Sequence, residues 1–130
     1  MTTASAPGKI ILFGEHAVVS GTAALGGAID LRARAMVESL PGRVLIETDD
    51  LSIRGFSFDL ASGLVSSASA PYATRYVSAA LKELEARDVR VRIESDIPPA
   101  AGLGSSASIV VATVAALNAH ADLGLSQKDI

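Results

Sequence analysis

The sequence predicts a mixed α/β fold in a single domain. Three observations support this: segments in which apolar and polar residues alternate as in strands, an amphipathic helical repeat, and a glycine-rich loop between a strand and a second, apolar helix. The chain has 130 residues and 49% of them are hydrophobic, which is enough for one domain core. We find no internal repeat and no low-complexity tract.

The N-terminal part of the chain is expected to form strands. Lys9–Phe13 is a short apolar run between two glycines and predicts a buried strand, which Ala17–Val19 is expected to continue. Ser20-Gly21 then predicts a turn. From Ile29 to Val37, apolar residues alternate with polar ones, so the segment 23–39 is interpreted as a half-buried strand, although its Ala and Arg residues favour helix individually.

The next strands follow turn signals. Pro41-Gly42 predicts a turn, and Val44–Thr48 is expected to be the antiparallel partner of the preceding strand in a hairpin. Asp49-Asp50 predicts another turn, and Ile53–Phe58 a weaker strand. The small, polar segment Ser62–Ala70 predicts a loop inside the domain.

An amphipathic helix is expected after Pro71, a residue that suits the first turn of a helix. Apolar residues recur at helical spacing from Tyr72 to Leu84, and charged residues occupy the other face, so the helix is expected to end near Arg87-Asp88. The residues Val89, Val91 and Ile93 alternate with charged ones and predict a strand that is wet on one face.

The C-terminal part predicts a loop and a second helix. Ile97–Gly104 is rich in Pro and Gly, and Ser105–Asn118 is a helix that is apolar on nearly all sides and therefore expected to be buried. Leu123-Gly124 closes this helix. Ser126 is a candidate N-cap, with Gln127–Ile130 as the first turn of a further helix.

Composition excludes several classes of protein. The net charge of -3 comes from mixed acids and bases, so nucleic acid is not an expected partner. No cysteine is present, which excludes disulfides and cysteine-bound metals. The N-terminus has no secretory pattern, and the longest apolar run, Ile109–Leu117, is too short for a bilayer crossing. We therefore expect no membrane partner and a cytoplasmic location.

The segment Pro98–Ala107 has the features of a phosphate-binding loop. It contains Gly-Leu-Gly-Ser-Ser at 102–106, immediately before the apolar helix. A helix start offers free N–H groups and partial positive charge, glycine allows close backbone approach, and hydroxyls can bind phosphate or Mg²⁺. The loop is neither a Walker loop nor a dinucleotide fingerprint. A simple turn with a serine-capped helix explains the same residues, and both interpretations stay open.

Three ionisable residues flank the first predicted strand. Lys9 begins it, and Glu15 and His16 follow the glycine that ends it. A lysine can stabilise transferred phosphoryl charge, while carboxylate and imidazole groups can hold substrate hydroxyls. Each residue also has an ordinary interpretation, as a solvated strand end, a surface turn or a half-buried histidine. His120, late on the second helix, is interpreted as structural only.

Together the two motifs resemble the GHMP kinases, a superfamily that includes galactokinase, homoserine kinase, mevalonate kinase and phosphomevalonate kinase. Ala6-Pro7-Gly8-Lys9 followed by Gly14–Val19 is most similar to the mevalonate kinase branch, because galactokinases continue differently after Gly-Glu-His and phosphomevalonate kinases usually carry Tyr in place of His16. Pro98–Ala107 is similar to the family's ATP loop. Ala100-Ala101 departs from it, because many members have glycine at one of these positions.

The resemblance implies a two-layer α/β domain with a left-handed β-α-β crossover. It implies ATP-dependent phosphorylation of the 5-hydroxyl of mevalonate in isoprenoid precursor synthesis, with Mg²⁺. Lys9 would lie near the reacting hydroxyl and the transferred phosphate, Glu15 and His16 would contact mevalonate, and Ser106 would ligate Mg²⁺. The ATP-binding residues would be Pro99, Ala100, Ala101, Gly102, Leu103, Gly104, Ser105, Ser106 and Ala107.

The resemblance also implies that residues 1–130 are the N-terminal, ATP-binding domain of a kinase more than twice as long. The catalytic aspartate, a metal-binding glutamate and a third glycine-rich motif would belong to an absent C-terminal domain, so the chain alone is expected to be inactive. The full-length protein could form a homodimer. Two alternatives stay open: another small-molecule kinase of the superfamily, acting on galactose or phosphomevalonate, and a non-catalytic nucleotide-binding module.

Overall fold

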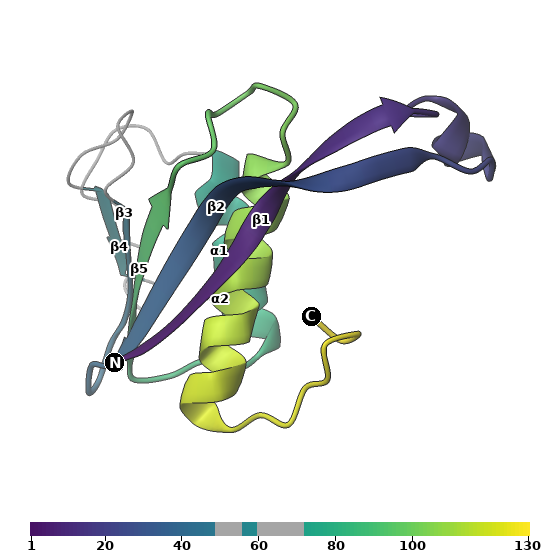
Figure 1. Ribbon diagram of the computed structural model, residues 1–130. Coiled ribbons are helices and arrows are strands. Elements are labelled where there is room, and N and C mark those ends of the chain that lie inside the picture. The colour runs from purple at the N-terminus through teal and green to yellow at the C-terminus, as the bar shows by residue number, and fades with distance from the viewer. Residues whose placement is uncertain (49–55, 60–71) are drawn as a thin grey trace.

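The computed structural model describes residues 1–48, 56–59 and 72–130. Within these residues, one mixed β-sheet with the strand order β1-β2-β5-β3-β4 carries two α-helices on one face (Figure 1). The elements are β1 (Thr2–Phe13), a 3₁₀ helix η1 (Ala17–Ser20), β2 (Leu25–Ser39), β3 (Val44–Thr48), β4 (Phe56–Asp59), α1 (Tyr72–Glu83), β5 (Val89–Ser95) and α2 (Ser105–Ala121). The two-layer α/β fold predicted from the sequence is confirmed.

The predicted hairpin between β2 and β3 is wrong. β3 is a strand, but β5 lies between it and β2, antiparallel to β2 and parallel to β3. The turn after β2 is bonded to the residue before β5 instead, because Leu40 N–H donates to Asp88 O and Val89 N–H to Arg43 O. β5 is the middle strand of the sheet, and Val91 on it is fully buried. A strand with a neighbour on each side keeps such side chains from water.

The core lies between the sheet and the two helices. It contains alternate residues of β2, β3 and β5, as the period of two predicts, together with Val77 and Leu81 of α1. α1 ends at Glu83, earlier than predicted, and Tyr76 is exposed, so its apolar face is centred on Val77 and Leu81. Four sequence expectations, namely the turn at Asp49-Asp50, the start of the strand at Ile53, the loop Ser62–Ala70 and the helix start at Pro71, lie outside the described residues.

α2 packs on β1, β2, β5 and α1. Ser108, Ile109, Ala112, Thr113, Ala116 and Leu117 are its buried residues. The prediction that α2 is buried on nearly all sides is therefore wrong: Val111, on the outer face, is 37% exposed. The helix layer has nothing beyond it among the described residues, so the outer face of α2 meets solvent. The helix ends at Ala121, later than predicted, with Asp122 in a left-handed conformation (φ 52°).

His120 connects the end of α2 to two strands. Its Nδ1 lies 3.3 Å from Thr2 Oγ1 of β1, and its Nε2 lies 3.3 Å from Ser39 Oγ of β2. Both ring nitrogens therefore have hydroxyl partners. The structural role expected for His120 agrees with this arrangement, although the partners were not visible in the sequence.

A long hairpin of β1 and β2 projects from the body of the domain (Figure 1). We call its outer part, residues 9–29, the arm. The prediction of a buried strand at Lys9–Phe13 is wrong in its burial: the strand forms, but Leu12 is 57% exposed and Phe13 is 73% exposed. η1 at the tip also corrects the prediction that Ala17–Val19 continues the strand. Gly14 turns the chain there at φ 87°, where an added Cβ would lie 2.7 Å from Ala23 O.

The parallel pair of β3 and β5 creates a β-α-β unit. The connection from β3 to β5 runs through β4 and α1. The left-handed sense of this crossover stays a prediction from the resemblance. No helix within the described part of the chain is long and apolar enough to span a membrane.

Candidate functional site

A hollow of about 390 Å³ lies at the start of α2. Lys9 borders it on the β1 side, and the loop before α2 forms the rest of its wall. The loop residues that line it are Pro98, Ala100, Ala101, Gly102, Leu103, Gly104, Ser105, Ser106 and Ala107. The structure thus brings Lys9 together with the predicted phosphate loop, although some ninety positions separate them in the sequence. Of the predicted loop residues, Pro99 does not line the hollow, whereas Pro98 does.

Three residues of the loop have left-handed backbone conformations. Gly102 and Gly104 have φ values of 72° and 77°, and Ala100 has φ 58°. Glycine adopts this region without steric cost, whereas alanine pays for its Cβ. The two glycines therefore have the conformation that the sequence motif requires. In the sequence, Ala100-Ala101 stands where many GHMP kinases have a glycine. Ala100 is the one of the two whose positive φ favours glycine.

The start of α2 presents unneutralised backbone donors to the hollow. Gly104 is the N-cap and supplies no side chain, and no acidic residue lies in the first turn. The first N–H groups of a helix have no partner within it, and they carry the positive end of the helix dipole. Ser105 and Ser106, both half-buried, add hydroxyl groups at this point. The hollow is therefore suited to an anion, and the alternative of a serine-capped start is not what the structure contains.

The loop and the first turns of α2 are attached to β1 by two hydrogen bonds. Lys9 N–H donates to Leu103 O at 2.9 Å, and the Ser108 hydroxyl donates to Pro7 O at 2.7 Å. The stem of Lys9 passes over the N-cap: a Cβ added to Gly104 would lie 2.8 Å from Lys9 Cγ and 3.3 Å from Lys9 Cε. The carbonyl of Leu103 accepts the bond from Lys9 N–H, and its side chain packs against the edge of the core. The backbone of Lys9 is thus bonded to the phosphate loop, and its exposed side chain passes along Gly104.

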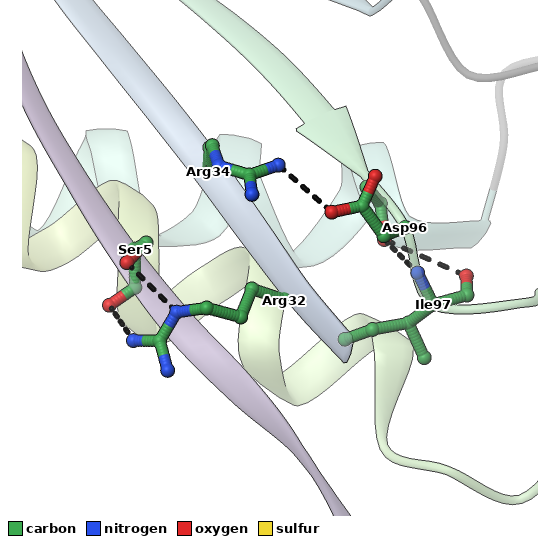
Figure 2. A network of polar contacts seen from close by, with 6 residues as sticks. Ser5, Arg32, Arg34, Asp96 and Ile97 are labelled. Atoms are coloured by element: carbon green, nitrogen blue, oxygen red, sulfur yellow. Dashed lines mark hydrogen bonds and ion pairs between the residues drawn. The ribbon is translucent and has the colours of Figure 1, made fainter. Parts of the chain in front are cut away.

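A polar network fixes the place where the arm leaves the body (Figure 2). Arg32 of β2 donates from Nε to Ser5 Oγ at 3.0 Å, and from Nη2 to Ser5 O at 3.2 Å. Arg34 forms an ion pair with Asp96 at 2.8 Å. Asp96 N–H donates to Arg32 O, and Asp96 is where the chain passes from β5 towards the loop. These contacts hold the entrance of the loop at the base of the arm.

Glu15 and His16 lie elsewhere. They form the turn between β1 and η1, at the tip of the arm, and both are exposed. Strand residues rise about 3.4 Å each, so the end of β1, at Phe13, lies about 14 Å beyond Lys9. No described contact connects Glu15 or His16 to the hollow. Their predicted contact with a substrate stays a prediction.

Ser108 is a residue of this region that the sequence analysis missed. The residue is 4% exposed, and it is one of the two buried hydroxyl residues of α2. A signal was available, because Ser108 falls on the apolar stripe that also contains Ile109 and Ala112. A polar group on a buried stripe needs a partner, but the identity of that partner, Pro7 O, could not be read from the sequence.

Comparisons with known proteins agree with this architecture. The family described as the GHMP kinases N terminal domain matches residues 71–130, which include the loop and α2. The mevalonate kinase of Pyrococcus abyssi is 38% identical over 140 aligned residues, covering 100% of this chain and 42% of its own length. That of Archaeoglobus fulgidus is 44% identical over 127 residues, covering 98% of this chain and 41% of its own length.

The fold is also shared with solved structures. The crystal structure of the Methanococcus jannaschii mevalonate kinase superposes with a TM-score of 0.75 and 27% identity, over 98% of this chain and 42% of that one. The chain therefore spans about two fifths of the length of the curated relatives that it matches. Its loop, its fold and its similarity over nearly all its residues agree with one another. The chain is a homologue of the mevalonate kinases and has the N-terminal domain fold of the GHMP kinases.

Proposed function

We propose that the chain forms the nucleotide-binding part of an ATP-dependent kinase that phosphorylates the 5-hydroxyl of mevalonate. In this proposal residues 1–130 are an N-terminal domain, and a longer chain completes the enzyme. Membership of the GHMP kinase family implies the use of ATP, and the archaeal relatives named above carry the name mevalonate kinase. The single observation that carries the proposal is the position of Lys9 against the uncapped, glycine-lined start of α2.

The triphosphate of ATP would occupy the hollow. The N–H groups at the start of α2 would bind phosphate oxygens, and Gly102 and Gly104 would allow the phosphates to approach the backbone. The residues assigned to ATP binding are Pro99–Ala107, of which Ala100–Ala107 line the hollow and Pro99 does not. Lys9 supplies the one charged side chain among the described residues that line the hollow, and its charge is opposite to that of the ligand.

The lining residues fit Mg²⁺ only as part of a nucleotide complex. Ser106 offers a hydroxyl oxygen, a ligand type that Mg²⁺ accepts, but the described lining contains no carboxylate. No cluster of acidic, His or Cys side chains that could hold a metal by itself occurs among the described residues. Ser106 would therefore be one ligand of an ion held mainly by phosphate oxygens. Bound there, Mg²⁺ would neutralise charge on the phosphates.

Lys9 would act on the phosphoryl group in transfer. The transition state spreads negative charge over the phosphoryl oxygens, and a fixed cation stabilises it without having to reorganise. The Lys9 backbone N–H donates to Leu103 O and its stem lies along Gly104, so the side chain lies beside the loop without a ligand. Glu15 and His16 would contact mevalonate from the arm. We place the enzyme in the cytoplasm, where its nucleotide substrate is present.

The 130-residue chain by itself should not catalyse phosphoryl transfer to mevalonate. Transfer to a hydroxyl needs a group that manages the hydroxyl proton, and the described residues lining the hollow include no acid or histidine. We expect the chain to bind Mg·ATP, measured by isothermal titration calorimetry, and to release no ADP above background when mevalonate is added. Lys9→Met should weaken the binding. Wild-type chain that binds no nucleotide would contradict the proposed site.

The acceptor can be tested with a chimera. Residues 1–130 would replace the matching 42% of the Pyrococcus abyssi mevalonate kinase, and mevalonate, phosphomevalonate and galactose would be assayed as acceptors. We expect phosphorylation of mevalonate, with the parent enzyme as the positive control and a thermal melt to show that the chimera is folded. A folded chimera that phosphorylates galactose or phosphomevalonate, but not mevalonate, would exclude the proposed acceptor. A folded chimera that binds ATP without transfer to any acceptor would favour a non-catalytic module.

A further inference from the structure

We propose that Ser108 is a positioning residue for Lys9: its hydroxyl fixes strand β1 to the start of α2, and thereby holds the Lys9 side chain over the phosphate loop. The effect of Ser108 on ligand binding rests on the function proposed above. The hydrogen bond between Ser108 and Pro7 does not depend on that function. The proposal is carried by a buried hydroxyl, by two hydrogen bonds on one strand edge and by the close approach of Lys9 to Gly104.

The Ser108 hydroxyl connects segments that are far apart in the sequence. Its Oγ lies 2.7 Å from Pro7 O and 3.0 Å from Gly104 O. Gly104 O already accepts the backbone N–H of Ser108 at 2.9 Å, as expected for the first turn of a helix. The hydroxyl has a single proton to donate, so its contribution to the structure is mainly the shorter bond to Pro7.

The same edge of β1 carries the second bond. β1 is the edge strand of the sheet, and alternate residues of an edge strand direct their backbone groups away from the sheet. Lys9 N–H points this way, towards Leu103 O, and so does the carbonyl of Pro7, two residues earlier. The two bonds flank Gly8, where an added Cβ would lie 3.0 Å from Leu103 O. The loop and the strand therefore touch through their backbones.

The two hydrogen bonds that connect β1 to the loop and to α2 determine where the Lys9 side chain lies. Lys9 follows Pro7 by two residues, and its stem already lies against Gly104. Loss of the Ser108 hydroxyl would leave the Lys9 N–H bond as the remaining described backbone link between this part of β1 and the loop. β1 could then shift along the loop, and the ammonium group would lose its fixed position. Positioning errors of this kind weaken charge interactions without removing the charge.

Thr113 provides a matched control on the same helix. It is the second buried hydroxyl of α2, fully buried, and its Oγ1 donates to Ile109 O at 2.8 Å, within its own helix. Thr113→Val thus removes a buried hydroxyl and an intrahelical bond while it preserves the shape of the side chain. Ser108→Ala also removes a buried hydroxyl, but in addition it detaches Pro7. A general loss of helix stability should affect both variants.

The first experiment is a double-mutant cycle on nucleotide binding. The dissociation constant of Mg·ATP would be measured by calorimetry for the wild-type chain, Ser108→Ala, Lys9→Met, the double variant and Thr113→Val. Ser108→Ala should weaken binding about 5-fold when Lys9 is present and less than about 2-fold in the Lys9→Met background, the size expected from one coupled hydrogen bond. Thr113→Val should stay within about 2-fold of wild type.

The second experiment needs no ligand. Hydrogen exchange of the Lys9 amide, followed by NMR, should become about 10-fold faster in Ser108→Ala and remain unchanged in Thr113→Val, relative to amides of β5. Equal loss of binding in both lysine backgrounds, or unchanged exchange at Lys9, would overturn the positioning role. If the wild-type chain bound no nucleotide, the proposed function would fail, while the exchange experiment would still decide whether Ser108 fixes β1.

Discussion

The side chain of Lys9 lies directly over the backbone of Gly104, and a side chain at position 104 would have to displace it. An added Cβ would lie 2.8 Å from Lys9 Cγ, shorter than ordinary van der Waals contact, and the backbone there has φ 77°. The contact brings the positive charge of β1 to the start of α2. Gly104 is therefore needed for two reasons: its backbone has a positive φ, and the Lys9 stem occupies the space of a side chain.

Gly104→Ala should therefore damage both the site and the fold. The left-handed backbone costs an L-residue about 1 kcal/mol, and displacement of the Lys9 stem adds to this. We expect a lower free energy of unfolding by about 2 kcal/mol in urea titrations, and weaker binding of Mg·ATP. Gly42→Ala is the matched control, since Gly42 has φ 76° but nothing within 4 Å of an added Cβ. Equal destabilisation by the two variants would contradict the role of the Lys9 contact.

Ala100→Gly should stabilise the chain. Ala100 has φ 58°, so glycine would remove a steric cost of about 1–2 kcal/mol and add an unfolded-state entropy cost of about 0.5–1 kcal/mol. The net gain is expected to be about 0.5 kcal/mol, seen as a higher midpoint of thermal unfolding. Ala101→Gly, at a position without a positive φ, should lower the midpoint instead. A lower midpoint for Ala100→Gly would show that the strain is not present in solution.

The apolar arm should contribute little to the stability of the described chain. Leu12 and Phe13 are mostly exposed and lie outside the core, so the double change Leu12→Ser and Phe13→Ser removes little buried area. We expect the free energy of unfolding to change by less than about 0.5 kcal/mol, and binding of a hydrophobic dye to fall. Val77→Ala, in the core, is the comparison and should cost about 2 kcal/mol. A large loss of stability in the arm variant would mean that the arm packs against the body.

Asp129 should titrate below its ordinary range. The Ser126 hydroxyl donates to Asp129 Oδ2 at 2.6 Å and the Ser126 N–H at 2.8 Å, and these bonds, the hydroxyl first, lower the pKa of the carboxyl group. Because the pKa is lower in the folded state, the bonds stabilise the C-terminal turn at pH values above the ordinary carboxyl range. The stabilisation is lost as pH falls through the folded-state pKa.

NMR titration of the Asp129 carboxyl carbon is the direct measurement. Ser126→Ala should move the pKa upwards towards the ordinary value while the backbone bond keeps part of the shift. Asp129→Asn should remove the titration altogether. An unchanged pKa in Ser126→Ala would mean that the hydroxyl is not the main cause.

Local sequence signals predicted elements whose formation depends on short-range patterns. The alternation from Ala33 to Val37 gave the buried face of β2, and the strand from Val89 to Ile93 was confirmed in the same way. The glycines at 102 and 104 predicted a loop that has the expected positive φ values. These features follow from the preferences of individual residues and from the period of the side chains.

Those local signals did not predict which strands pair with each other in the sheet. Val44–Thr48 reads equally well as a partner of β2 or of β5, because strand patterns contain no information on which neighbour supplies the hydrogen bonds. Lys9–Phe13 is apolar and reads as buried, but burial depends on what lies next to the strand in space. The outer face of α2 was misjudged for the same reason, since a helix layer with nothing beyond it exposes one side.

By itself, the sequence determined the two chemical motifs of this protein and the mixed α/β character of its fold. The residue types and the spacing of Lys9 and of the loop 98–107 are properties of the chain, and they were sufficient to indicate the GHMP kinases. Only the tertiary structure decided that Lys9 lies on Gly104, that Ser108 binds Pro7, and that Glu15 and His16 stand apart at the tip of the arm. The physical reason is that these contacts are made across strand edges and helix ends, where packing of the whole core sets the distances.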